Sequence, residues 1–201
     1  MTKRVAVLAS GRGSNFQAVI DAIRDGKVPA SCVRLITDNP KAYAIERAKT
    51  AGIPFTVVDY TSFPSRDVYE RALLHAMQDC NADLFVLAGY MRIVGREIVQ
   101  AFAGRMINIH PALLPSFPGL HGQQQAIRHG VKISGCTVHF VDENLDGGPI
   151  ILQQCVPVLE NDDEDRLAAR ILENEHRCLP EAIRLFCEDR LVIEGRQVRI
   201  H

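Results

Sequence analysis

The sequence has no excess of charge of either sign. Its 201 residues include 23 Lys and Arg against 24 Asp and Glu, so the formal net charge is −1 at pH 7. The hydrophobic fraction of 47% and the charged fraction of 23% are ordinary for a globular protein. Nucleic-acid-binding domains usually carry a strongly basic surface, so this balance argues against an RNA or DNA partner.

A long hydrophobic run is also missing. A membrane-spanning helix needs about 20 consecutive apolar residues, and no stretch of the sequence approaches that length. The apolar run near the start covers only residues 5–9 and stops at a glycine-rich turn, so it predicts a first strand and not a signal peptide. We therefore expect a cytoplasmic protein without a membrane partner.

Cysteine and histidine are present, but not in the spacings that bind metals. The six cysteines contain no C-x-x-C pair, and in a chain of this class they predict reduced thiols of a cytosolic protein. None of the seven histidines belongs to H-E-x-x-H or another metal-ligand spacing. Neither Ser14 nor Ser134 lies in the G-x-S-x-G motif of an esterase nucleophile. We expect no metal ion.

The order of apolar and amphipathic segments predicts an α/β fold. In the first half, near-continuous apolar strands separated by helices favour a mostly parallel sheet flanked by helices. In the second half, strands over 136–141 and 150–158 follow each other without a helix, which predicts antiparallel strands added to the sheet. A long helix is expected over 163–189, bent or interrupted at Pro180. The other expected strands are 4–9, 33–37, 55–58, 84–87 and 106–109, and the other helices are 14–25, 43–51, 65–79 and 96–102.

The sequence contains no internal repeat, low-complexity segment or linker, so we expect one domain over residues 1–201. Its N-terminal half extends to about residue 100 and its C-terminal half covers about 101–190. A small terminal hairpin is expected over 191–201.

Two polar side chains, Asn108 and His110, stand two residues apart in the apolar stretch MINIH. Because side chains on a strand alternate between its faces, both are expected to point the same way. An amide donor beside a ring that exchanges a proton near neutral pH suits a site that handles an oxygen atom gaining negative charge. The alternative is a pair of core residues with backbone partners, which is common in proteins.

A glycine-rich turn, SGRGSN, follows the first expected strand and leads directly into a helix. Backbone N–H groups at a helix N-terminus attract anions, so Gly13, Ser14 and Asn15 are candidates for binding a phosphate. A dinucleotide fingerprint would need a third glycine where the sequence has Phe16, and an acidic residue that comes earlier than Asp38. A structural turn with an N-cap residue is the other alternative.

The loop DENLDGGP over residues 142–149 is the third candidate feature. Two glycines after Asp146 give the backbone freedom to place that carboxylate against another group. If Asp146 reaches His110, it orients the imidazole and favours the protonated ring. An acidic loop that is merely solvated is the alternative.

Three further polar residues give weaker signals. His139 alternates with apolar neighbours on an expected strand, and we interpret it as structural. Arg66 lies near the start of an expected helix, where it is most often a surface charge. Arg92 follows a buried strand, at the sheet edge where open α/β folds bind ligands.

Several motifs, in the right order, resemble the formyltransferases that use 10-formyltetrahydrofolate. They are GRGSN at 11–15, AGYMRIV at 88–94, NIHP at 108–111 and LDGGP at 145–149. The resemblance extends from residue 5 to about residue 183, and the GRGSN motif and the length point to the members that act on glycinamide ribonucleotide. Ser116, residues 122–125 and the tail after Leu191 match least.

The resemblance implies a Rossmann-like formyltransferase fold and an activity. The formyl group of 10-formyltetrahydrofolate would pass directly to the amine of glycinamide ribonucleotide, a step of purine biosynthesis. Asn108 and His110 would stabilise the tetrahedral oxyanion, and Asp146 would assist proton transfer. No metal is implied, and the partners would be these two small molecules, with the protein a monomer or homodimer.

The resemblance also implies binding residues. Gly13, Ser14 and Asn15 would bind the substrate phosphate, and Glu175 would bind the glycinamide amine end. The N-terminal half would therefore hold the phosphate, while the C-terminal half would carry catalysis and much of the folate site. The implied folate contacts are Arg66, Met91, Arg92, Ile93, Val94, Asn108, Val141, Asp142, Glu143, Asn144, Leu145 and Asp146.

Related enzymes with a similar catalytic domain are the main alternatives. A methionyl-tRNA formyltransferase normally adds a C-terminal tRNA domain, for which this chain is too short. A formyltetrahydrofolate deformylase normally adds an N-terminal regulatory domain, whereas Met1 lies just before the first expected strand. A sugar-nucleotide formyltransferase would not need the GSN turn. Asn108, His110 and Asp146 disfavour a non-catalytic binding module, and Phe16 disfavours a dinucleotide-dependent oxidoreductase.

Overall fold

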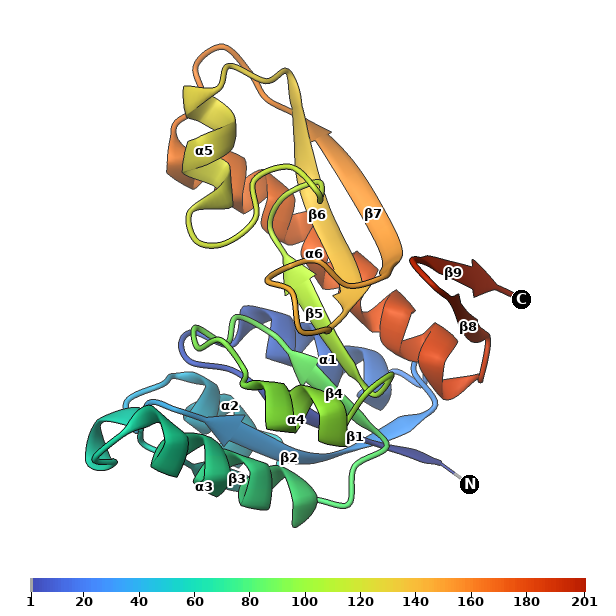
Figure 1. The fold of residues 1–201 in the computed structure, drawn as a ribbon. Helices are drawn as coiled ribbons and strands as arrows, with labels where there is room; N and C mark the ends of the chain where they lie inside the picture. The colour runs from blue at the N-terminus through green and yellow to red at the C-terminus, as the bar shows by residue number, and fades with distance from the viewer. Residues whose placement is uncertain (1) are drawn as a thin grey trace. The chain divides into compact units, whose positions relative to one another are not determined.

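The computed structural model describes residues 2–201, which divide into two compact units (Figure 1). The first unit ends at Ile107 and the second covers Asn108–His201. The expected α/β fold, with parallel strands in the first half and antiparallel strands added in the second, is confirmed. The single domain expected over residues 1–201 stays a prediction.

The first unit is built on parallel strands in the order β3-β2-β1-β4. Residues 5–8 of β1 and all of β4 are buried, although side chains of a strand point alternately to both faces of the sheet. Both faces of these central strands are therefore covered, as a parallel sheet requires. The strands are β1 (Lys3–Leu8), β2 (Ala30–Thr37), β3 (Phe55–Val57) and β4 (Leu84–Leu87).

The helices of the first unit connect successive strands. In α1, the apolar residues Phe16, Val19 and Ile20 are buried, which matches the three- and four-residue spacing of one helix face. The α3 helix begins after Ser65, whose hydroxyl accepts the Val68 N–H at 3.4 Å. The helices are α1 (Ser14–Arg24), α2 (Ala44–Thr50), the 3-10 helix η1 (Tyr60–Ser62), α3 (Arg66–Gln78) and α4 (Arg96–Ala101).

The second unit contains mostly antiparallel pairs. Strand β5 (Met106–His110) begins in the first unit and ends in the second. In the second unit, β6 (Ile133–Phe140) pairs antiparallel with β7 (Ile150–Pro157). The neighbour of β7 on its other side is β9 (Gln197–Ile200), which pairs antiparallel with β8 (Leu191–Glu194) as a terminal hairpin.

The long helix α6 (Glu164–Cys187) packs its apolar face on β6 and β7. It continues through Pro180 without interruption, so the expectation of a break there is wrong. No helix among residues 2–201 is both long enough and apolar enough to cross a membrane.

One helix and one strand boundary in the second unit differ from the sequence-based expectation. The short helix α5 (Gly122–Arg128) was not expected, because only Gly122 and Ala126 of it are buried and its other residues give no clear apolar face. Strand β6 begins at Ile133, before the expected residue 136. Gly135 resembles a turn residue in the sequence, yet it allows close strand pairing: a Cβ there would lie 1.9 Å from the Gln154 carbonyl oxygen.

The connection from β7 to α6 is stabilised by hydrogen bonds to the side chain of Asp162. Its carboxylate accepts hydrogen bonds from both terminal nitrogens of Arg170, at 2.6 and 2.9 Å, and from the Leu159 N–H at 2.8 Å. A bidentate arginine–carboxylate pair of this kind is among the stronger polar contacts in proteins. The Arg170 guanidinium, aided by the Leu159 amide, lowers the pKa of Asp162 to about 2.

Replacing Asp162 with Asn is expected to lower stability in a pH-dependent way. The folded-state pKa of about 2 lies below the ordinary value of 3.8, so the carboxylate stabilises the fold above pH 4. That contribution is lost as the pH falls through about 2. Urea unfolding from pH 7 to pH 2 should therefore show a stability gap between wild type and variant that shrinks only below about pH 4.

The control is Glu194→Gln, which removes the carboxylate of an exposed pair with Arg199 in the same unit. Exposed pairs contribute little, so this variant should unfold like wild type across the pH range. A gap for Asp162→Asn that stays constant down to pH 2 would contradict the assignment.

Candidate functional site

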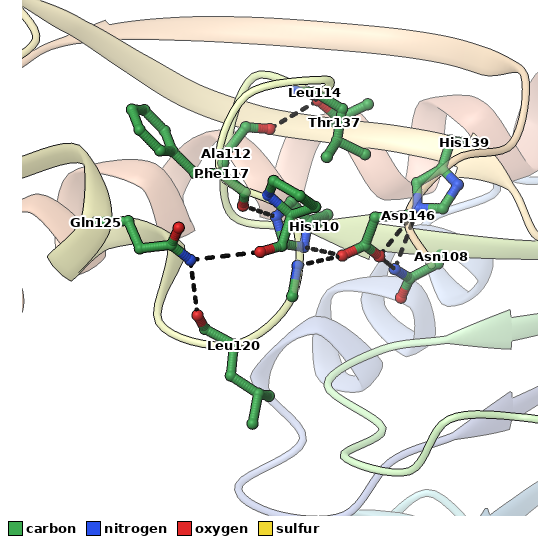
Figure 2. A network of polar contacts seen from close by, with 12 residues as sticks. Asn108, His110, Ala112, Leu114, Phe117, Leu120, Gln125, Thr137, His139 and Asp146 are labelled. Carbon is green, nitrogen blue, oxygen red and sulfur yellow. Dashed lines mark hydrogen bonds and ion pairs between the residues drawn. The ribbon is translucent and has the colours of Figure 1, made fainter. Parts of the chain in front are cut away.

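The polar side chains at the end of β5 converge on one carboxylate of the second unit (Figure 2). Asp146, from the loop between β6 and β7, places its Oδ2 atom 3.4 Å from Nδ1 of His110. Its Oδ1 atom lies 3.4 Å from the amide nitrogen of Asn108. Asn108 and His110 therefore share a face of the strand, as their spacing predicted, and Asp146 reaches both.

The loop reaches this position through an unusual backbone conformation. Asp146 itself has a positive φ of 50°, a region that Asp and Asn enter more readily than most residues. Gly148 then passes so close to β6 that a Cβ there would lie 1.8 Å from the Phe140 carbonyl oxygen. The glycines thus allow the close approach, while Asp146 makes the turn.

His139 lies in the same site, although its sequence pattern suggested a structural residue. Its Nε2 atom is 3.2 Å from the amide nitrogen of Asn108 and 3.7 Å from Oδ1 of Asp146. Its Nδ1 atom lies 2.8 Å from the Phe140 carbonyl oxygen, which can only accept a hydrogen bond. In the neutral ring the proton is therefore assigned to Nδ1, which leaves Nε2 to accept from Asn108.

His139 orients the amide of Asn108. With Nε2 as an acceptor, the two N–H groups of that amide point to His139 and Asp146. A signal for His139 was present in the sequence: it lies one residue before the end of the strand that leads directly into the loop carrying Asp146. Alternation with apolar neighbours could not reveal which side chains stand opposite it.

The His110 ring lies between two acceptors. Its Nε2 atom is 2.8 Å from the carbonyl oxygen of Phe117, and its Nδ1 atom faces Asp146. The doubly protonated ring donates to both acceptors, whereas the neutral ring can donate to only one. The same loop supplies the Gly119 N–H, which donates to Oδ2 of Asp146 at 2.7 Å.

Burial and hydrogen bonding oppose each other at Asp146. Burial of the side chain, of which 9% is exposed, acts to raise the pKa of Asp146. The neighbouring His139 and His110 rings and the hydrogen bond from the Gly119 N–H outweigh it, and together they hold the pKa of Asp146 below its ordinary value. Asp146 is therefore a carboxylate at neutral pH.

The loop that contacts His110 is anchored by Thr137 of β6 (Figure 2). The Thr137 hydroxyl donates to the Ala112 carbonyl at 2.7 Å and accepts the Leu114 N–H at 3.0 Å. The side-chain amide of Gln153 adds bonds to the Leu114 carbonyl at 2.8 Å and to the Thr137 hydroxyl at 3.0 Å. These contacts fix the chain on the approach to Phe117.

The residues expected to bind a phosphate lie in the first unit, at the start of α1. Gly13 has a φ of +66°, and a Cβ there would lie 2.8 Å from Cβ of Ala44, so only glycine fits without strain. Asn15 is buried, and Ser14 begins the helix. The turn therefore has the backbone form of an anion site, and its role stays a prediction.

The residues expected to contact folate lie in both units. In the first unit, Arg66 is exposed and its guanidinium contacts Glu70 at 2.6 Å, while Met91 and Ile93 have exposed apolar side chains. Arg92 forms an ion pair with Asp38. The expected residues of the second unit are Val141, Asp142, Glu143, Asn144, Leu145 and Asp146, all in or beside the loop between β6 and β7.

Glu175 is buried within α6 of the second unit. Its expected contact with the amine end of a substrate stays a prediction. Among residues 2–201, no group of three or more His, Cys, Asp or Glu side chains is arranged to hold a metal ion.

Comparisons with known proteins give consistent results. Residues 3–183 match the model of the formyl transferase family. A phosphoribosylglycinamide formyltransferase of Escherichia coli (strain K12) is 43% identical over 187 residues, which cover 93% of this chain and 88% of the relative. The structure of glycinamide ribonucleotide transformylase 1 from Symbiobacterium toebii is similar with a TM-score of 0.97 and 52% identity, and the match covers 99% of this chain and 94% of that chain.

A longer relative also matches. The trifunctional purine biosynthetic protein adenosine-3 of Drosophila melanogaster is 48% identical over 186 residues. That match covers 92% of this chain but 14% of the relative, so this chain corresponds to a small part of that protein.

Replacing Thr137 with Val is expected to loosen the loop that contacts His110. The isosteric change removes the hydroxyl that accepts from the Leu114 N–H and donates to the Ala112 carbonyl, and leaves the N–H with only the Ala112 carbonyl, at 3.2 Å. Loss of these buried hydrogen bonds costs about 1–3 kcal/mol. Urea unfolding should report the loss of stability, and amide hydrogen exchange at Leu114 should become faster. Thr137→Ser keeps the hydroxyl and should retain the protection of Leu114. Equal protection of that amide in wild type and Thr137→Val would contradict the anchoring role.

Proposed function

Because the chain belongs to the formyl transferase family, we propose that it transfers the formyl group of 10-formyltetrahydrofolate to the amine of glycinamide ribonucleotide, in purine biosynthesis. The match over residues 3–183 supports formyl transfer, and the names of the similar proteins support glycinamide ribonucleotide as the acceptor. The folate donor is proposed from the resemblance of the sequence motifs. The observation that carries the proposal is the cluster of Asn108, His110 and Asp146, because it offers polar donors and a carboxylate at one point.

The reaction requires stabilisation of a developing oxyanion. The amine nitrogen attacks the formyl carbon, and the carbonyl oxygen becomes negatively charged in the tetrahedral intermediate. In our proposal the His110 ring and the Asn108 amide donate to that oxygen, and the amide does so by turning one of its two N–H groups away from its present partner, His139 or Asp146. Loss of one such donor typically costs about 10²–10³-fold in rate.

Substrate binding must then change one contact of His110. The Nε2–H group that would face the oxyanion lies 2.8 Å from the Phe117 carbonyl. In the proposed reaction the substrate oxygen takes the place of this carbonyl, while Asp146 keeps its contact with Nδ1. The Phe117 carbonyl thereby holds the ring in orientation until substrate arrives.

Asp146 assists the movement of a proton. The attacking amine loses one proton as the new C–N bond forms, and the N10 atom of the folate gains one as the old C–N bond breaks. Asp146 remains ionised at neutral pH, so it can orient His110 and stabilise positive charge near the amine. Protons are therefore balanced without a covalent enzyme intermediate.

The remaining expected residues fit the proposed ligands in chemical type. The backbone of Gly13, Ser14 and Asn15 at a helix start suits a phosphate, and the carboxylate of Glu175 suits an amine. For the folate, the first unit offers the exposed side chains of Met91 and Ile93, which are 59% and 63% exposed. The second unit offers Leu145, which is 57% exposed. The remaining proposed folate contacts are Arg66, Arg92, Val94, Asn108, Val141, Asp142, Glu143, Asn144 and Asp146.

The proposed acceptor is tested by following the loss of the formyl group from 10-formyltetrahydrofolate. The protein is incubated with glycinamide ribonucleotide, with charged methionyl-tRNA, or with buffer alone. We expect rapid loss only with glycinamide ribonucleotide, together with formation of its formyl derivative. Equal loss in buffer would contradict the proposal and favour a hydrolase, and loss with tRNA would favour a different acceptor.

Variants of the clustered residues test the proposed roles. His110→Ala and Asp146→Asn are each expected to lower kcat by about 10²–10³-fold, since each affects stabilisation of the transition state. Their unfolding midpoints in urea should change much less. His75→Ala, at an exposed histidine of α3, is the matched control and should keep full activity. A loss of stability that accounts for the whole loss of activity would indicate ordinary core residues.

A further inference from the structure

A second polar cluster, built around a buried carboxylate, lies in the first unit and takes no part in the proposed formyl transfer step. It consists of Asp38, Tyr60, Tyr69, Tyr90 and Arg92, and we call it the Asp38 cluster. Asp38 directly follows β2, and Tyr90 and Arg92 follow β4, so the cluster joins the exits of two strands. These strand ends form the edge of a parallel sheet at which ligands usually bind.

The negative charge of the Asp38 carboxylate is compensated by the guanidinium of Arg92. The Asp38 side chain is 3% exposed, and its Oδ2 atom accepts a hydrogen bond from Nε of Arg92 at 2.8 Å. Its Oδ1 atom is also buried and has no hydrogen-bond partner among residues 2–201. A buried carboxylate is costly unless it is paired, so the Arg92 guanidinium is what compensates this charge.

The Arg92 guanidinium is held on a second side by an aromatic ring. Its central carbon lies 3.9 Å from the centroid of the Tyr60 ring, a distance typical of a cation–π contact. The Tyr60 ring in turn packs edge-to-face on Tyr69, with centroids 4.9 Å apart. The short helix η1 that carries Tyr60 is capped by Asp59, whose carboxylate accepts the Thr61 N–H at 2.9 Å.

The chain just before Arg92 is fixed as well. The hydroxyl groups of Tyr69 and Tyr90 are hydrogen-bonded to each other inside the unit. Burial raises the pKa of Tyr69 to about 12 and raises the pKa of Tyr90, so both phenols stay neutral. The Met91 N–H donates to the Ser10 hydroxyl at 2.8 Å. Three consecutive residues, 90–92, are therefore each anchored to a different part of the first unit.

These anchors leave the outer side of the segment open. The side chains of Met91 and Ile93 are 59% and 63% exposed, whereas Tyr90 and Arg92 contact Tyr69 and Asp38. A segment whose backbone is fixed before binding loses less conformational entropy when a ligand arrives. Fixed backbone with exposed apolar side chains suits a flat ring that is recognised along its edge by main-chain groups.

We infer that Asp38, acting through Arg92, is a positioning residue that fixes the backbone of residues 90–93 for the folate ring. The inference rests on the proposed function, under which Met91, Arg92, Ile93 and Val94 contact the folate. Asp38 itself does not touch the ligand. The Asp38 carboxylate fixes the position of the Arg92 side chain through their ion pair. The fixed side chain in turn restricts the backbone of residues 90–93.

The first test compares Asp38→Asn with Asp25→Asn. Asp38→Asn keeps the shape of the side chain but removes the charge that holds Arg92. We expect the KM for 10-formyltetrahydrofolate to rise about tenfold, because the segment must be ordered on binding. The kcat and the KM for glycinamide ribonucleotide should stay within about twofold, a split that a general structural defect would not produce. Asp25→Asn removes a carboxylate from an exposed pair with Lys27 and should leave all three constants unchanged.

The second test does not depend on the folding of the Asp38 variant. Tyr60→Leu removes the ring beneath Arg92, and Tyr60→Phe keeps it. Tyr60→Leu should raise the KM for 10-formyltetrahydrofolate by about three- to fivefold, as expected for a partly exposed cation–π contact. Tyr60→Phe should restore the wild-type value. Binding of tetrahydrofolate, measured by titration calorimetry, should weaken by the same factors.

Failure of the inference is distinguishable from failure of the proposed function. If wild type shows no transfer to glycinamide ribonucleotide, the proposed function is wrong. If wild type transfers but both Asp38→Asn and Tyr60→Leu keep a normal KM for 10-formyltetrahydrofolate, the positioning role alone is wrong. The positioning role would also be overturned if Asp38→Asn raised both KM values equally. The same holds if the variant lowered kcat and left the KM for 10-formyltetrahydrofolate unchanged.

Discussion

The carboxylate of Asp146 is buried, and each of its oxygens has a polar neighbour in the second unit. Oδ2 accepts from the Gly119 amide and faces His110, while Oδ1 faces Asn108 and His139. A buried negative charge is stable only when such donors surround it. The positions of the two histidines and of the asparagine amide are therefore coupled to this one group, and a displacement of Asp146 would leave several donors without their partner.

The same requirement organises the loop after β5. Phe117 and Gly119 present one carbonyl and one amide to His110 and Asp146. The loop can do so because Thr137 and Gln153 hold it further back, at Leu114. Groups that are fixed in advance in this way cost no reorganisation during a reaction, which is the property that an oxyanion site needs. Structure and proposed chemistry thus depend on the same set of hydrogen bonds.

The two units compensate buried carboxylates in different ways. In the second unit, Asp146 is surrounded by groups that can donate to a substrate or exchange a proton. In the first unit, Asp38 is paired with Arg92, whose charge is permanent. A permanent ion pair suits the proposed role of fixing the backbone of residues 90–93, whereas the titratable ring of His110 suits proton transfer. The chemical type of each partner therefore agrees with the role proposed for each cluster.

The sequence by itself determined the α/β class and most of the helices and strands, because apolar periodicity is a local property of the chain. It also indicated that Asn108 and His110 share a face, since the alternation of a strand is fixed by backbone geometry. Continuity of α6 through Pro180 and the start of β6 at Ile133 were decided by tertiary packing, which local rules do not describe. The contacts of His139 with Asn108 and of Asp38 with Arg92 likewise arise only when distant segments meet. Only the folded chain could show them, because a polar side chain acquires its partner through space and not through its neighbours in the sequence.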